Sequence, residues 1–232
     1  MPAGVNIRGD SNNIQISTDV PNLVLLSKGT SVLSDAPWDP GSSVFTGSHA
    51  SMSFPNDKGH PPIVAFSCDI EIAVLRVRLV SGNWVYTVAT RDVGKTNTVE
   101  WWAFAEHSSS KTAGFGLRVM DSSGNVVFNS SLKPMVIRQY QSEDIGSSGS
   151  VSIASGRKLA IAILGLKIGV TAQIPSGAWV QYLSATGLKT NSNTGTIIPL
   201  QQFGELRWPV NFGFGAGTSG KWSAFALDVT NY

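Results

Sequence analysis

Gly4-Val-Asn-Ile7, followed by a polar turn and Ile14-Gln-Ile16, forms a passage that this chain contains twice. The second copy lies 112 positions later and reads Gly116-Leu-Arg-Val119, a turn, and Val126-Val-Phe128. Each copy alternates apolar and polar residues on both sides of its turn, which predicts a half-buried antiparallel hairpin. Only four aligned positions are identical, so the pattern indicates either an internal duplication or two unrelated hairpins of similar design.

The composition of the whole chain also favours strands over helices. Its 232 residues include 24 Gly, 11 Pro, seven Trp and ten Phe, with many Ser, Thr and Asn. Turn-forming residues mixed with aromatic and β-branched residues are typical of β proteins. Strand-like runs recur every 8 to 14 residues with turns between them. This spacing predicts an all-β fold, an antiparallel β-sandwich of jelly-roll type.

The repeat also predicts how the chain is organised. An N-terminal β region over residues 1–112 would hold the first hairpin, and a C-terminal β region over 113–232 would hold the second. The length allows two similar β subdomains or one compact domain, and both stay open. The proline-rich stretch 34–62 is expected to be a long loop, and 142–149 a flexible Ser/Gly tract. The apolar run 159–170 is expected to be a buried strand bent at Gly165, with a short core helix as the alternative.

Charge and cysteine content exclude several classes of partner. Charged residues make up 14% of the chain, the net charge is +2 and no basic run exceeds two residues. No nucleic-acid partner is therefore expected. Cys68, the single cysteine, lies in an apolar run and is expected to be a buried, inert thiol. We expect synthesis in the cytoplasm without membrane insertion, because no signal peptide is recognisable and no apolar run is long enough to cross a bilayer.

Few residues offer catalytic chemistry. His49, His60 and His107 are spread along the chain without the spacing of metal ligands. Glu100 and Glu106 bracket an aromatic strand, but six strand residues separate the carboxylates by about 20 Å, too far for glycoside hydrolysis. No nucleophile elbow, phosphate loop or dinucleotide fingerprint occurs. We therefore expect no catalytic residue, no metal and no cofactor.

Tryptophans are the side chains best suited to binding. Indole rings that lie in turn-rich sequence can stack on sugars or anchor a protein partner. We predict three binding residues on this basis, with core filling as the alternative for each: Trp38, Trp208 and Trp222. Three others are expected to fill the core: Trp84, Trp101 and Trp179.

The second hairpin region resembles a motif of small tail proteins of long-tailed bacteriophages. The motif runs Gly-Leu-x-Val, a turn with Gly, an apolar strand ending in an aromatic residue, a polar pair and a basic-Pro step. Its parts here are Gly116-Leu-Arg-Val119, Gly124, Phe128, Asn129-Ser130 and Lys133-Pro134. The opening Met1–Ile7 is similar to the start of the same proteins, whereas Asn129 departs from the Asp expected there. The resemblance covers about 50 of the 232 residues.

This resemblance implies a structural or adhesion component of a phage tail, located in the virion near the tail tip or the fibres. Its expected partners are other tail proteins and further copies of itself, a homotrimer by analogy. A bacterial surface glycan or receptor is a further expected partner. The main alternative is a carbohydrate-binding module that recognises bacterial surface glycans through exposed tryptophans. A glycan-degrading enzyme that uses a carboxylate such as Glu100 is a third hypothesis, and a pore-forming protein a fourth.

Overall fold

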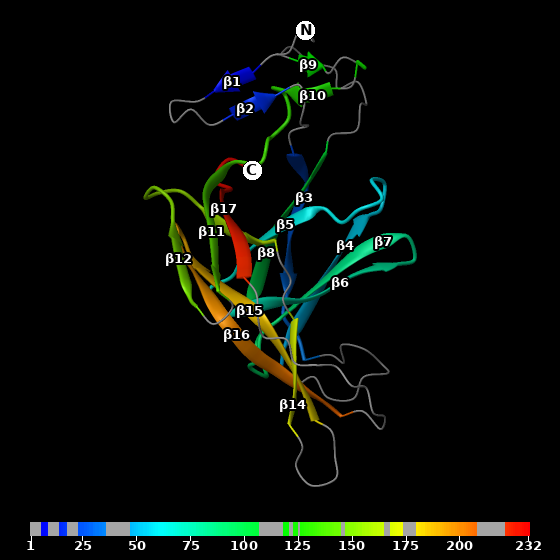
Figure 1. Cartoon of the computed structure of the whole chain (residues 1–232), viewed down its shortest axis with the longest axis vertical. Coiled ribbons are helices and arrows are strands. Elements are labelled where there is room, and N and C mark those ends of the chain that lie inside the picture. Colours follow the sequence, from blue (N-terminus) through cyan, green and yellow to red (C-terminus); the bar gives the residue numbers. More distant parts are fainter. Residues whose placement is uncertain are drawn as a thin grey trace.

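A computed structural model describes residues 6–8, 14–17, 23–35, 47–106, 118–120, 123–124, 126–144, 147–164, 168–173, 180–207 and 221–232. Every helix or strand assigned within these ranges is a β-strand. Two large antiparallel sheets pack against each other, and two small hairpins stand together beyond one end of this sandwich (Figure 1). The predicted all-β antiparallel sandwich is confirmed. The described ranges hold no helix long and apolar enough to span a membrane.

One sheet has six strands. Their order across the sheet is β11 (Ile137–Asp144), β17 (Lys221–Asp228), β13 (Leu159–Ile163), β5 (Ile63–Ser67), β8 (Thr98–Glu106) and β3 (Leu23–Val32).

The other sheet has seven strands. Six follow the order β12 (Gly149–Ser152), β16 (Thr194–Arg207), β15 (Val180–Asn191), β6 (Ile72–Val80), β7 (Asn83–Ala89) and β4 (His49–Pro55). The seventh, β14 (Ile168–Gln173), pairs with β15 off this path. Ser81 and Gly82 close the turn between β6 and β7, and both adopt positive φ, as the predicted tight turn requires.

The strand order of both sheets is symmetric with respect to the two halves of the chain. The central pairs are β5 with β13 and β6 with β15, both antiparallel and each joining the first half to the second. Outward from the first pair lie β8 and β17, then β3 and β11; outward from the second lie β7 and β16, then β4 and β12. Each half thus supplies three strands in the same order to each sheet, as an approximate twofold axis requires. Among the described strands, β14 has no counterpart.

The two hairpins repeat this relation at the level of single residues. Their strands are β1 (Asn6–Arg8), β2 (Ile14–Ser17), β9 (Arg118–Met120) and β10 (Val126–Asn129). Ile7 pairs with Ile16 in the first hairpin, and Val119 with Phe128 in the second. Both hairpins contain a β-bulge beside that pair, and the strand ends, pairs and bulge all coincide at the spacing of 112 residues. The structure therefore supports the hypothesis of an internal duplication.

One further bulge follows each hairpin, and the two bulges lie at equivalent positions. In β3 the register against β8 shifts between Leu25 and Ser27, so that Leu26 is the extra residue. In β11 the register against β17 shifts between Ile137 and Gln139, which makes Arg138 the extra residue. A bulge re-aims the side chain that it carries. The equivalent bulge thus carries a leucine in the first half and an arginine in the second.

The two edges of the six-stranded sheet meet each other. A β-bridge joins Val24 in β3 to Pro134, just before β11. Beside it, the Leu25 N–H donates to the Lys133 carbonyl and the Met135 N–H to the Leu23 carbonyl, each at 2.8 Å. These contacts close the sheet into a barrel-like ring at the base of the two hairpins. We call the two hairpins together the head (residues 6–17 and 118–129, where described).

Two apolar cores follow from this closure. The largest fully buried side chains between the two sheets include Phe54, Phe66, Ile161, Leu188 and Trp222. A second cluster lies on the opposite face of the six-stranded sheet, inside the ring, and contains Trp102, Phe104 and Leu227, with Met135 and Tyr232 packed against it. Phe104 and Tyr232 meet edge to face, with ring centroids 5.6 Å apart. Residues of both halves contribute to both cores.

Three details differ from the sequence-based expectations. The stretch 34–62 contains β4, whose buried Ala50, Met52 and Phe54 alternate with exposed Ser51 and Ser53, so the prediction of a continuous loop there is wrong. Pro55 fits at the end of this strand because β4 is an edge strand.

The other two differences from the sequence-based expectations lie in the second half of the chain. The tract 142–149 is partly strand, because β11 continues to Asp144 and β12 begins at Gly149. In the apolar run 159–170, residues 159–163 form β13 and residues 168–170 belong to β14, so these parts are strand rather than helix. The predicted bend at Gly165 lies outside the described residues.

Candidate functional site

The tryptophans predicted to bind a ligand do not form a site in the described part of the chain. Trp38 and Trp208 lie outside the described residues, as does Trp179. Trp222 is fully buried, and its Nε1 donates to the Ser147 carbonyl at 3.0 Å. The prediction that Trp222 is a binding residue is wrong, because side chains alternate along β17 and this one points between the sheets.

The other residues considered for chemistry are dispersed. His49 begins β4, where burial lowers its pKa although Asp35 opposes the change. His60 is exposed beside the Pro61 carbonyl, and His107 lies outside the described residues. Within the described ranges, no group of three or more His, Cys, Asp or Glu side chains is placed to hold a metal ion. Cys68 is buried as predicted, and burial raises the pKa of its thiol.

A polar groove of about 880 Å³ opens between the ends of the two sheets. Hydroxyl and amide side chains dominate its wall: Ser67, Asn97, Thr98, Thr190, Asn191, Ser192 and Thr230. Four charged residues also line it: Asp69, Glu100, Arg157 and Lys158. The Lys158 Nζ lies 2.5 Å from the Glu100 Oε2, so this carboxylate is already engaged in an ion pair.

A buried threonine ties the two sheets together at the floor of the groove. The Thr190 hydroxyl accepts from the Cys68 N–H at 2.9 Å and lies 2.8 Å from the Ser67 hydroxyl. The Thr190 N–H donates to the Cys68 carbonyl, also at 2.8 Å. Because β5 ends at Ser67 and β15 contains Thr190, these bonds fix the distance between the sheets where the groove opens.

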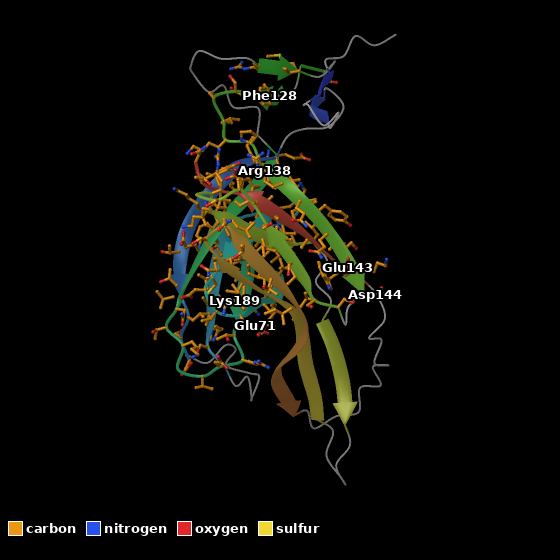
Figure 2. All side chains as sticks on the ribbon, turned by 90° about the vertical axis from the view of Figure 1, so that its left-hand side faces the viewer. Glu71, Phe128, Arg138, Glu143, Asp144 and Lys189 are labelled. Carbon is orange, nitrogen blue, oxygen red and sulfur yellow. The ribbon has the colours of Figure 1, made fainter. Side chains whose placement is uncertain are left out.

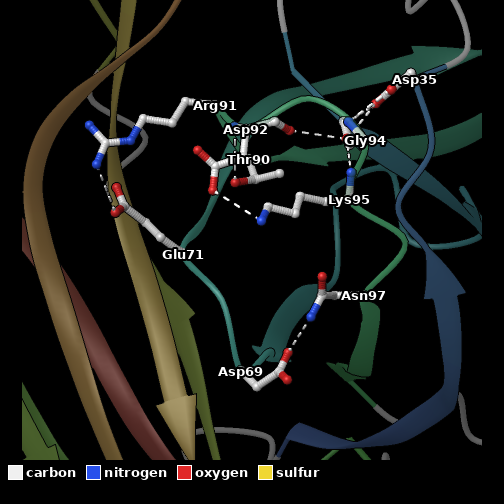
Figure 3. A network of polar contacts seen from close by, with 10 residues as sticks. Asp35, Asp69, Glu71, Thr90, Arg91, Asp92, Gly94, Lys95 and Asn97 are labelled. Atoms are coloured by element: carbon white, nitrogen blue, oxygen red, sulfur yellow. Dashed lines mark hydrogen bonds and ion pairs between the residues drawn. The ribbon is translucent and has the colours of Figure 1, made fainter.

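The chain between β7 and β8 forms one end of the groove and is held by a polar network (Figure 3). Asp35 accepts from the Gly94 N–H with both carboxylate oxygens, at 3.0 and 2.9 Å. The Asn97 amide donates to Asp69 at 3.0 Å, and Arg91 lies 4.0 Å from Glu71. Burial raises the pKa of Glu71, and the charge of Arg91 opposes that change. Asp69 and Asn97 therefore enter the groove already positioned.

The twofold repeat places a second opening between the sheets, and its lining differs. This pocket of about 230 Å³ is lined mainly by Pro, Val, Ile and Leu side chains. When β5 and β13 are aligned through their partners β8 and β17, Leu164 takes the place of Ser67. The polarity of the groove is therefore a property of its own residues and not a consequence of the repeated fold.

A cationic pocket of about 230 Å³ adjoins the groove at Arg157, which lines both. Lys133, Arg138 and Arg157 line it around a single carboxylate, Asp228. The Asp228 Oδ2 accepts from Arg138 at 3.0 Å and lies 3.7 Å from the Arg157 Nη1. Burial alone would raise the pKa of Asp228, but hydrogen bonds from Thr230 and Arg138 outweigh it and hold the pKa below its ordinary value.

The head stands directly above this cationic pocket. Figure 2 shows Phe128 in the head and Arg138 at the end of the sandwich beneath it. In the head, Phe128 packs on Val119, which is 7% exposed, and this small cluster is separate from the two larger cores. Lys133 and Pro134 link the head to the closure of the ring, and Tyr232 donates a hydrogen bond to the Pro134 carbonyl.

Comparison of the chain with protein-family models, with curated proteins and with solved structures finds no match. Sequence reasoning missed the cationic pocket, whose residues come from three separate segments. The one local signal was the Arg157-Lys158 pair, which follows Gly156 in a turn with positive φ. A dibasic turn can be read from sequence, but its approach to Arg138 and Lys133 depends on the pairing of β11 and β13 with β17.

Proposed function

We propose that this chain is a non-enzymatic structural or attachment subunit of a bacteriophage tail. The head carries this proposal. Its two hairpins contain the sequence that resembles phage tail proteins, share one register and bulge, and project together from the sandwich (Figure 1). A small element with its own apolar cluster suits docking onto a neighbouring tail protein, and the sandwich is then free to point elsewhere.

The body of the protein supports a role in binding rather than turnover. Glu100, the carboxylate considered for glycan hydrolysis, is paired with Lys158 and stands at the opposite end of β8 from Glu106. The groove offers hydroxyl, amide and charged groups to a ligand along an open surface. These features favour recognition of a partner by contact. We further propose that the chain acts as a homo-oligomer in the virion, with a trimer as the first expectation.

The location is tested by imaging and mass spectrometry of virions from a phage that encodes this chain. We expect the chain in the tail, with the head against another tail protein. Phe128→Asp should reduce incorporation at least tenfold, because it places a charge in the Val119–Phe128 cluster. Met120→Ser is the matched control, since Met120 lies in the same hairpin and is 47% exposed.

Two results would contradict the proposal. One is the absence of the chain from purified virions; the other is release of product from a polysaccharide by the isolated protein. Light scattering of the purified chain tests the oligomer separately, and a monomer at micromolar concentration would exclude the trimer.

Glycan binding is a second candidate function, and the polar groove is the observation that favours it. Its residues differ from those the sequence indicated, because Trp222 is buried and the groove wall is made of hydroxyl, amide and charged groups.

A further inference from the structure

We infer that the polar groove and the adjoining cationic pocket together bind an acidic oligosaccharide, with a uronic-acid carboxylate against Arg157. This inference deepens the proposed attachment function by naming a ligand class. The groove and the pocket are contiguous, because Arg157 lines both of them. A chain of several sugar units can therefore lie along the groove with one acidic group at the junction.

The pocket contains more positive than negative side chains, which favours an anionic ligand. Three cationic side chains, Lys133, Arg138 and Arg157, face one carboxylate there. Asp228 gives its short contact to Arg138 and satisfies Thr230 with its other oxygen, which leaves Arg157 at 3.7 Å. The Arg157 side chain is 44% exposed, so its guanidinium has donors directed to solvent. A planar carboxylate is the group that this fork of N–H donors recognises best.

The bulge in β11 indicates that this pocket is specific to the second half. Arg138 is the extra residue of that bulge, and its equivalent in β3 is Leu26, which is 42% exposed. Each half therefore has a bulge that orients the side chain at this position in the same way. Only the second half has a cationic side chain there. The two openings between the sheets also differ, because one is lined mainly by polar side chains and the other mainly by apolar ones.

Asp69 and its hydroxyl neighbours in the groove favour a sugar chain over a uniform polyanion. Asp69 accepts from Asn97 and stands among hydroxyl side chains. Carboxylates accept hydrogen bonds from sugar hydroxyls, whereas they repel a second anion. A ligand with hydroxyls along its length and an acidic group at one place satisfies both ends of the groove. A nucleic acid or polyphosphate would place negative charge beside Asp69.

Titration calorimetry of the full chain at low salt tests the inference, with oligogalacturonate and oligomannuronate as probes. We expect at least one of them to bind, and its methyl ester and neutral dextran oligosaccharides to bind at least tenfold more weakly. Arg157→Gln should lower the affinity for the acidic probe at least tenfold. The control is Arg78→Gln, which removes an exposed cation on β6 that lines neither the groove nor the pocket. This variant should bind the acidic probe with the affinity of the wild type.

Three results would overturn the inference: neither acidic probe binds, the ester binds as tightly as the acid, or Arg157→Gln binds like the wild type. Thermal melting of each variant checks its fold. If Arg157→Gln melts early, Lys133→Gln takes its place, because Lys133 is in the same pocket and makes no ion pair with Asp228. Tail incorporation is scored separately, so a chain that binds the acidic probe but is absent from virions contradicts only the proposed function.

Discussion

At the scale of single residues, Trp222 depends on a glycine across the core. A Cβ atom added to Gly149 in β12 would lie 2.6 Å from the Trp222 ring, closer than real Cβ contacts come. The indole can therefore fill the space between the sheets only where β12 has no side chain. Its Nε1 reaches the Ser147 carbonyl, so burial leaves no polar group of the ring unpaired.

Trp222→Ala should lower the free energy of unfolding by about 3–5 kcal/mol, because it leaves a large cavity in the main core. Urea unfolding followed by circular dichroism measures the change. Trp84→Ala is the comparison: Trp84 is half-buried at the edge of the same core, so the loss should be smaller. A change below about 1 kcal/mol for Trp222→Ala would show that the ring is not a core residue.

Asp228 should make stability depend on acid pH. Its pKa is lower in the folded protein than in the unfolded chain, so its contribution is present at neutral pH and is lost as pH falls through the folded pKa. Asp228→Asn should therefore cost about 1–2 kcal/mol near pH 7, because Arg138 and Arg157 lose a carboxylate but stay partly exposed to solvent. The difference between wild type and variant should shrink below about pH 4. Equal differences at pH 7 and pH 3 would contradict this assignment.

At the scale of elements, the head is a separate unit of packing. Its Val119–Phe128 cluster contacts neither of the two large cores. Local opening of such an element costs less free energy than global unfolding. The head can therefore loosen or adapt to a partner while the sandwich stays folded.

Phe128→Ala should increase amide hydrogen exchange in β9 and β10 at least tenfold and leave the urea midpoint of the whole protein within experimental error. Phe104→Ala is the contrast, because Phe104 is fully buried inside the ring and should lower that midpoint clearly. The separation of head and body fails if both variants lower the midpoint equally.

The sequence predicted the elements whose patterns are local. The two hairpins and the all-β class follow from alternation and turns, and the Ser81-Gly82 turn from its residue types. β4 was missed because prolines surround its alternating residues, and only its edge position makes them acceptable. The cationic pocket was missed because Lys133, Arg138 and Arg157 meet only when β11, β17 and β13 pair, and these strands are far apart in the sequence. Non-local pairing of this kind leaves no short-range signal.

At the scale of the whole molecule, the repeat and the shared sheets predict how the chain unfolds. Both sheets are continuous across the two halves through β5–β13 and β6–β15, and both cores contain residues of each half. Neither half completes a core alone. The repeated strand pattern is therefore not divided into two separate cores.

We expect a single cooperative unfolding transition, with coincident curves from tryptophan fluorescence and circular dichroism. Val64→Ala and Ile161→Ala, at equivalent buried positions beside the central pair of the six-stranded sheet, should each shift this one transition. Two separated transitions, or a shift of only one probe by either variant, would show that the halves fold independently.

The closure of the six-stranded sheet at Val24 and Pro134 also decides how this molecule would carry a load. A pulling force on the head reaches the sandwich through two chain segments, one from each half. Backbone hydrogen bonds join these two segments where they enter the ring. The force is thus divided between β3 and β11, which are the two edge strands of one sheet. Separating either strand from the sheet would also break its contacts with the other. A subunit anchored by its head would share tension between two equal tethers.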